Sequence, residues 1–206
     1  MPDRRDAPRL ILASRSPRRA QLLREAGFRF TQAEPPFDDP PQPVGAVGQG
    51  VEDLAGQLAG QKAMSLRGHV PDDSVILAAD TICVGTDDQL IGQPRDRDDA
   101  ERMIRYFMQR THGVVTGAAL LTHNMDTPQT LVDCTDVTLG ALSDVQLADY
   151  LDSGGWRGKA GGYNLFDRQA AGWPLTVQGD GTTVVGLPML KLVPALFALG
   201  VLPEPT

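Results

Sequence analysis

The sequence predicts an α/β fold, because runs typical of buried strands alternate with stretches of helical spacing. Residues 10–13 and 74–79 are continuous apolar runs, and the second is typical of a strand buried on both faces of a sheet. Between them, residues 51–66 place apolar side chains at intervals of three and four, the pattern of an amphipathic helix. We therefore expect a sheet with helices packed on it.

The first strand leads into a loop and a helix with strong local signals. Ser16 is a good N-cap and Pro17 suits the first helical position, so a helix is expected over residues 17–26. Arg18 and Arg19 then lie in its first turn, where cations oppose the helix dipole unless an anion lies between them. From these residues alone, an anion site and a solvated arginine face both remain open.

Further strands and helices follow from apolar runs bounded by turn residues. The expected strands cover residues 28–31, 81–85, 89–91, 114–121 and 130–139. The expected helices begin after caps at Asp96 and Ser143 and end near residues 109 and 151, and a last apolar helix covers residues 189–199. The strand over residues 74–79 is expected to end at Asp80, and the proline-rich residues 34–43 are expected to form an irregular loop.

Composition limits the class of protein. A chain of 206 residues with 41% hydrophobic content can build one sizeable core or two lobes that share a sheet. No window reaches the roughly 18 apolar residues of a membrane span, and the first residues lack a secretory core, so a cytoplasmic protein without membrane partners is expected. A net charge of −7 argues against a general nucleic-acid binder.

The cysteines and histidines carry no recognisable catalytic pattern. Cys83 and Cys134 form no CxxC pair, and two free buried thiols are expected. His69, His112 and His123 are scattered, so each is interpreted as a surface or satisfied core residue.

Polar and charged residues gather at strand ends and in the adjoining loops. The candidates are Ser14, Ser16, Arg18, Arg19, Asp39, Lys62, Asp80, Gln93 and Lys159. Fixed cations, hydroxyls and two acidic positions suit phosphoryl chemistry with Mg²⁺ or Mn²⁺: the cations would neutralise phosphate oxygens, and Asp39 and Asp80 would hold the metal or activate water. Lys62 could also extend to solvent and Asp80 could cap a turn, and these alternatives stay open.

Several short blocks recur in a recognisable order between residues 10 and 190. They are Ser14-Arg15-Ser16-Pro17-Arg18-Arg19, Gln61-Lys62-Ala63, Ala79-Asp80-Thr81, Gly92-Gln93-Pro94, Arg110-Thr111-His112, Lys159-Ala160-Gly161-Gly162-Tyr163 and Val184-Val185-Gly186-Leu187-Pro188. As a set, these blocks resemble the Maf family of nucleoside triphosphate pyrophosphatases.

The resemblance implies a fold related to inosine triphosphatase: a long mixed sheet, with helices that form two lobes around a central cleft. Residues 1–206 would form one such domain with residues 1–8 as a loose tail. The implied reaction is the divalent-metal-dependent hydrolysis of a nucleoside triphosphate to the monophosphate and pyrophosphate, a house-cleaning of nucleotide pools, in a homodimer. The association of the family with septum formation suggests an alternative, a nucleotide-binding regulator of cell division without turnover.

The resemblance also assigns roles to residues. Asp80 corresponds to the proton acceptor, and Asp39 lies where the family has a metal-side glutamate. The phosphate-cleft residues correspond to Ser14, Ser16, Arg19 and Lys62.

The resemblance implies that base specificity lies at the positions of Arg18, Thr81 and Phe166, and Gln93 is a further departure from the family pattern. Arg18 and Thr81 match the branch of the family that resembles dTTP/UTP pyrophosphatases. Phe166 replaces a family glutamine that could read a pyrimidine edge, and Gln93 replaces a family lysine. Because an aromatic ring stacks on any base, we expect Phe166 to broaden or shift the base preference.

Overall fold

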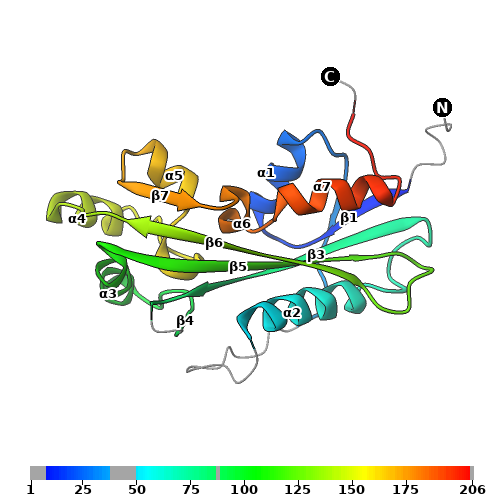
Figure 1. The fold of residues 1–206 in the computed structure, drawn as a ribbon, viewed down its shortest axis with the longest axis horizontal. Coiled ribbons are helices and arrows are strands. Elements are labelled where there is room, and N and C mark those ends of the chain that lie inside the picture. Colours follow the sequence, from blue (N-terminus) through cyan, green and yellow to red (C-terminus); the bar gives the residue numbers. More distant parts are fainter. Residues whose placement is uncertain (1–7, 38–49, 87–88, 205–206) are drawn as a thin grey trace.

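A mixed seven-stranded sheet forms the centre of the part of the chain that the structure describes (Figure 1). The structure is a computed structural model and describes residues 8–37, 50–86 and 89–204. The strand order is β2-β1-β3-β5-β6-β7, with β4 beside β3. The strands are β1 (Arg9–Ala13), β2 (Thr31–Ala33), β3 (Ser74–Val84), β4 (Leu90–Ile91), β5 (Arg110–Leu121), β6 (Gln129–Leu139) and β7 (Leu175–Gln178). The predicted α/β fold with a mixed sheet is confirmed.

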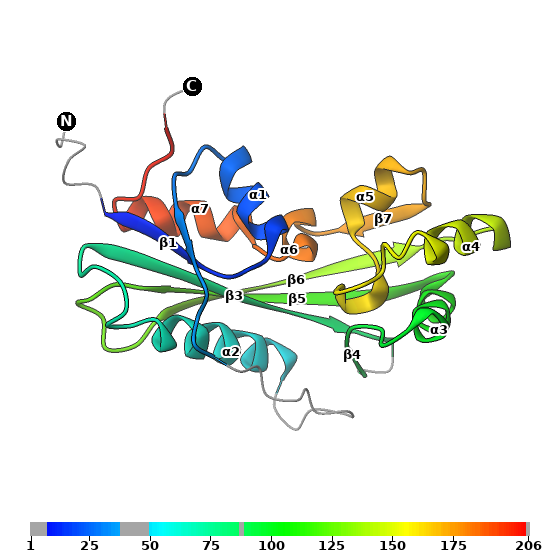
Figure 2. The same cartoon turned by 180° about the vertical axis from the view of Figure 1, so that it is seen from behind.

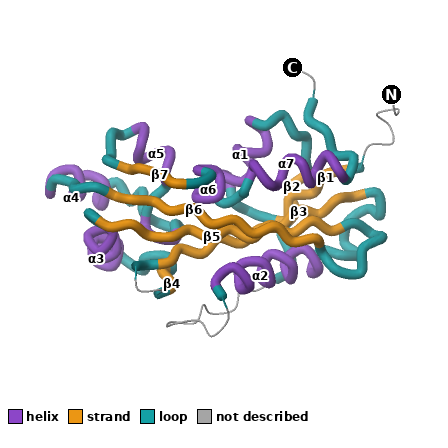
Figure 3. The backbone as a smooth tube through the Cα atoms, in the orientation of Figure 1, coloured by secondary structure: helices purple, strands orange, loops and turns teal. Residues whose placement is uncertain are grey.

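Pairing is parallel at one side of the sheet and antiparallel elsewhere. β1 runs parallel to both β2 and β3. The pairs β3–β4, β3–β5, β5–β6 and β6–β7 are antiparallel. The long strands β3, β5 and β6 extend through the whole molecule and connect its two ends (Figures 1 and 3).

Helices cover the two ends of the sheet differently. The helices are α1 (Pro17–Glu25), α2 (Val51–Ser65), α3 (Arg97–Phe107), α4 (Asp144–Asp152), α5 (Leu165–Ala170), α6 (Gly181–Val185) and α7 (Met189–Ala198), with a 3₁₀ turn at Ala160–Gly162. At the β1 end, α2 lies on one face of the sheet, and α1 and α7 lie on the other (Figures 1 and 2). At the opposite end, α3, α4 and α5 gather around β7 and the ends of β5 and β6 (Figure 2).

The core is divided between these two ends. One large cluster joins β1, α1 and α7, with Leu12, Leu23 and Leu196 fully buried. A second cluster joins α3, α4 and β7 and contains Phe107 and Trp173. The long strands contribute residues to both clusters, so the part of the sheet between the two clusters is fixed at both of its ends.

Close packing of α2 on β5 depends on Gly117. A Cβ atom at this position would collide with the backbone carbonyl of Ala55 in α2. Gly117 pairs directly with Asp80 across the β5–β3 ladder. The glycine therefore brings α2, which carries Lys62, close to the strand that carries Asp80.

The structure corrects three expectations. β2 covers Thr31–Ala33 rather than 28–31, because Phe28 is still part of the turn that ends α1 and is buried in the core. β3 does not stop at Asp80 but continues to Val84, since β5 pairs with it along its whole length. Cys134 is exposed, whereas Cys83 is buried as expected.

Three elements near the C-terminal side have no counterpart among the expected elements. They are the short helices α5 and α6 and the strand β7, which pairs with β6. The caps that local sequence predicts are confirmed: Ser16, Asp96 and Ser143 each accept a hydrogen bond from a backbone N–H three residues later.

Candidate active site

A cavity opens where one side of β3 has no strand partner among the described residues. On that side the ladder with β1 ends at Leu77 and the ladder with β4 begins at Cys83. A cavity of about 910 Å³ lies over the interval, and Asp80 and Thr81 are part of its lining. Further walls come from the loop before α1 and its first turn, the segment after β2, α2, the segment after β4, β5, residues 157–164 and α6, so both ends of the molecule contribute. In size it suits a nucleotide.

Cations outnumber carboxylates in the described lining. The six cationic residues are Arg15, Arg18, Arg19, Lys62, Arg157 and Lys159, and the two carboxylates are Glu34 and Asp80. The chain as a whole carries a net charge of −7. A local excess of cations in an acidic protein favours an anionic ligand, because it raises the potential at this one place.

Lys62 and Asp80 form a buried ion pair at the cavity. Lys62 Nζ lies 2.6 Å from Asp80 Oδ1, and both side chains are only 11% exposed. Asp80 Oδ2 is buried and has no hydrogen-bond partner among the described residues. Lys62 therefore does not extend to bulk solvent, and one carboxylate oxygen of Asp80 has no hydrogen-bond partner among the described residues.

Arg19 is held in a fixed orientation by three acceptors. Its Nη1 donates to Ser14 Oγ (3.2 Å), its Nη2 to Thr81 Oγ1 (3.1 Å) and its Nε to the carbonyl of Gly186 (2.9 Å). Gly186 has φ of +119°, and a Cβ there would lie 3.1 Å from Arg19 Nε. A glycine at this turn thus allows the guanidinium to approach. Ser16 Oγ accepts from the Arg19 backbone N–H at 3.4 Å and caps α1.

The glycine-rich segment forms part of the cavity wall. Gly158 and Gly161 line the cavity together with Lys159. Gly161 has φ of +73°, and a Cβ there would lie 3.3 Å from Cys83 Sγ, so the backbone packs directly on β3. Burial lowers the pKa of Lys159, which lies 3.9 Å from Asp167.

Most of the residues that the sequence predicted for the site share this cavity. Those in the lining are Ser14, Ser16, Arg18, Arg19, Lys62, Asp80, Thr81, Gln93 and Lys159. Gln93 is exposed at its rim. Asp39 lies outside the described residues, so its role stays a prediction.

The structure does not bring Phe166 to the cavity. Its side chain is 43% exposed, it is absent from the lining, and its ring packs beside Gly181. The neighbouring Asn164 lines the cavity instead, and its side chain accepts a hydrogen bond from the Asp167 backbone N–H. The expected stacking of Phe166 on a base is therefore unsupported by its position.

A histidine–tyrosine pair in the lining was missed by sequence reasoning. His112 Nε2 lies 2.8 Å from the Tyr163 hydroxyl, and the imidazole stacks on Phe107 at a centroid distance of 4.1 Å. Burial lowers the pKa of His112 to about 4, so the ring is neutral at pH 7. His112 is buried, with its Nε2 bonded to Tyr163 and its Nδ1 without a hydrogen-bond partner among the described residues. Strand alternation could have indicated this position, because it places His112 on the same face of β5 as Val114, and both residues line the cavity.

Comparison with known proteins assigns the family. A family model described as Maf-like protein matches residues 9–199. The chain belongs to the Maf family. A Maf family relative from Koribacter versatilis, named dTTP/UTP pyrophosphatase, is 38% identical over 198 residues, which cover 94% of this chain and 95% of the relative. The resemblance read from the motif blocks is thereby confirmed.

Two further Maf relatives carry the same name. The protein from Salinibacter ruber is 36% identical and covers 92% of this chain and 90% of its own length. The protein from Myxococcus xanthus is 37% identical, with coverages of 97% and 96%. None of the helices in the described part of this Maf protein has the length and apolar character to cross a membrane.

Proposed function

We propose that this protein hydrolyses nucleoside triphosphates at the α-phosphorus, releasing a nucleoside monophosphate and pyrophosphate, with dTTP and UTP as substrates. The observation that carries the proposal is a nucleotide-sized cavity in which cations surround one carboxylate with an unpartnered oxygen. The relatives named dTTP/UTP pyrophosphatase match this chain over nearly its whole length. We infer the same reaction for this protein because the cavity residues, and not only the 38% sequence identity, suit it.

In the proposed hydrolysis, the cationic side chains and the carboxylate of the cavity have different roles. Arg18, Arg19 and Lys159 offset the negative charge that the triphosphate brings and that the leaving pyrophosphate keeps. A water oxygen attacks the α-phosphorus, the bond from this phosphorus to the bridging oxygen breaks, and pyrophosphate leaves with the electron pair. The proton of the water passes to Asp80 Oδ2, the carboxylate oxygen that Lys62 leaves unoccupied.

A divalent cation fits the donors of this site. The Asp80 carboxylate, which lines the cavity, supplies hard oxygen donors of the kind that Mg²⁺ and Mn²⁺ prefer. Within the described residues no group of three or more histidine, cysteine or acidic side chains gathers, so the substrate phosphates would supply the other ligands with Asp80 and Asp39. When bound, the cation would polarise the phosphate and neutralise part of its charge.

We also propose a cellular location, partners and an oligomeric state for the enzyme. We place it in the cytoplasm, where it would remove unwanted nucleotides, without a nucleic-acid partner. The net charge of −7 supports the absence of a nucleic-acid partner, because the cations of the cavity wall are confined to one place and do not form the broad basic surface that nucleic-acid binding requires. The homodimer rests on the family resemblance alone, and sedimentation equilibrium tests it.

The test is a pyrophosphate-release assay with dTTP and UTP, with Mg²⁺ or Mn²⁺ added. Multiple turnovers that yield monophosphate and pyrophosphate in equal amounts support the enzyme. Stoichiometric nucleotide binding in calorimetry without product in either metal would contradict it and favour the regulator.

A further inference from the structure

A glycine-rich turn follows Lys159 at the cavity wall. Gly161 and Gly162 have φ of +73° and +78°, a backbone conformation that residues with a Cβ rarely adopt. Because a glycine backbone is restrained less than any other, the position of this turn depends on hydrogen bonds to neighbouring elements. One such bond joins the Gly161 N–H to the carbonyl of Gly92, directly after β4, at 3.1 Å.

Two tyrosine hydroxyls form further hydrogen bonds with the turn and the residue after it. The hydroxyl of Tyr150, on α4, donates to the carbonyl of Gly162 at 2.9 Å. The hydroxyl of Tyr163 lies 2.8 Å from Nε2 of His112, on β5. Both bonds are buried, so water does not compete for them. Each hydroxyl therefore connects the turn to an element of the core.

The backbone of the turn links these contacts to Lys159. The Gly162 N–H donates to the carbonyl of Lys159 at 3.0 Å, and the Gly162 carbonyl accepts from Tyr150. One peptide segment is thus bonded both to Lys159 and to α4. The Lys159 side chain lines the cavity and is 17% exposed. A displacement of the turn would therefore move its ammonium group relative to a bound triphosphate.

The two tyrosines differ in their access to a ligand. Tyr163 lines the cavity, whereas Tyr150 is not part of the lining. Tyr150 is 4% exposed, and its ring packs edge-on against Trp173 at a centroid distance of 4.9 Å. Its hydroxyl hydrogen is used by the Gly162 carbonyl. Any effect of the Tyr150 hydroxyl on the reaction must therefore pass through the turn.

We propose that Tyr150 and Tyr163 are positioning residues, whose hydroxyls fix the glycine-rich turn so that Lys159 meets the triphosphate. The inference rests on the proposed function and names the residues that orient one of its cations. His112 is the fixed partner of Tyr163 in this arrangement. An ammonium group that binds the phosphates before and during the reaction lowers KM, so its displacement should raise KM more than it lowers kcat.

The experiment is a double-mutant cycle on the KM and kcat of UTP hydrolysis. Lys159→Met should raise KM by roughly 10- to 100-fold, because it removes a charge-assisted contact with phosphate. Tyr150→Phe and Tyr163→Phe each remove a hydroxyl and keep the ring, and each should raise KM by about fivefold. In the Lys159→Met background, each should change KM by less than about twofold, because the group that they position is gone.

The cycle separates positioning from a purely structural role. Loss of folded protein would lower the apparent kcat by the same factor in both backgrounds and would leave KM unchanged. Direct contact between the Tyr163 hydroxyl and the substrate would make its effect on KM multiply with that of Lys159→Met. Where one tyrosine variant fails to fold, the other provides the same test.

Tyr106→Phe is the matched control. The Tyr106 hydroxyl accepts a hydrogen bond from the Thr86 N–H at 3.0 Å, and Tyr106 is not part of the cavity lining. This variant also loses one tyrosine hydroxyl, and it should leave KM for UTP unchanged.

Multiplying effects of Lys159→Met and a folded tyrosine variant on KM, or an unchanged KM in Lys159→Met, would overturn the inference while leaving the pyrophosphatase in place. Failure of the wild-type protein to hydrolyse any triphosphate would instead overturn the proposed function.

Discussion

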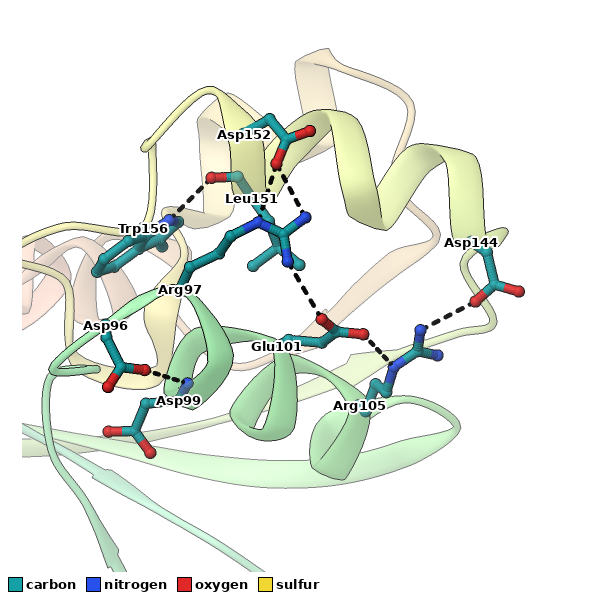
Figure 4. A network of polar contacts seen from close by, with 9 residues as sticks. All are labelled: Asp96, Arg97, Asp99, Glu101, Arg105, Asp144, Leu151, Asp152 and Trp156. Carbon is teal, nitrogen blue, oxygen red and sulfur yellow. Dashed lines mark hydrogen bonds and ion pairs between the residues drawn. The ribbon is translucent and has the colours of Figure 1, made fainter.

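The cavity wall and the outer surface of α3 and α4 contain the same charged residue types but arrange them differently. On the surface, each arginine drawn in Figure 4 has carboxylate partners: Arg97 contacts Asp152 (2.8 Å) and Glu101 (3.4 Å), and Arg105 contacts Glu101 (2.9 Å) and Asp144 (3.0 Å). These side chains are 32–88% exposed, compared with 11% for Lys62 and Asp80 in the cavity. Such pairs contribute little to stability, because water already satisfies both charges.

In the cavity, cations exceed carboxylates, and the pair of Lys62 with Asp80 is buried, whereas the pair of Arg15 with Glu34 is exposed. Six cationic residues against two carboxylates leave an excess of positive charge in the described lining, which favours an anionic ligand. The comparison teaches that the balance and burial of charges, rather than their number, mark the functional region. Four substitutions test this contrast.

Asp80→Asn should have the largest effect. It removes the proton acceptor of the proposed step, so kcat for dTTP or UTP should fall by about a thousandfold or more. Pyrophosphate release measures the rate, and circular dichroism checks that the fold is retained. Asp152→Asn, in the exposed α3–α4 network, is the control and should leave kcat unchanged. Retention of most activity in Asp80→Asn would assign the proton acceptor elsewhere.

Lys62→Met should strongly destabilise the protein. It leaves the Asp80 carboxylate buried without its cation, which lowers the free energy of unfolding by roughly 3–4 kcal/mol. Arg105→Met removes a cation from exposed pairs, and urea unfolding should detect little change. Equal losses in the two variants would show that burial does not separate the two regions.

His112 should make stability depend on pH. Burial lowers its pKa from 6.5 to about 4, so the unfolded chain binds more protons between these values. The free energy of unfolding should therefore fall as the pH decreases from 6.5 toward 4, by on the order of 3 kcal/mol from this residue.

His112→Gln should remove this component, whereas the exposed His123→Gln should retain it. Urea unfolding at several pH values measures the difference. Parallel pH profiles for the wild-type protein and His112→Gln would contradict the assignment.

Phe166→Ala should have the smallest effect on catalysis. The side chain is exposed and outside the cavity, so kcat/KM for UTP should change by less than about twofold. A tenfold loss would show that Phe166 reaches the substrate in a conformation other than this one.

Structural features that depend on residues close together in the chain, such as helix caps, were predictable from the sequence. The caps at Ser16, Asp96 and Ser143 use hydrogen bonds within three residues of the chain, so their signal is local. Motif blocks placed Lys62 and Asp80 in one site, although the 2.6 Å ion pair also requires Gly117 to admit α2 close to the sheet.

Features set by strand register were not predictable in this way. Thr81 meets Thr116 because β3 pairs with β5 in one particular register, 35 residues apart in sequence. The same register extends β3 past Asp80. The orientation of Phe166 depends on where α5 begins, at the Asn164 cap, and this short helix had no periodic pattern to reveal it.

Hydrolysis of UTP in water enriched in oxygen-18 tests the central claim most directly. Attack of water at the α-phosphorus next to Asp80 places the labelled oxygen in the monophosphate. The account predicts one labelled oxygen in UMP and unlabelled pyrophosphate by mass spectrometry. Label in the pyrophosphate, or release of UDP and inorganic phosphate, would contradict it.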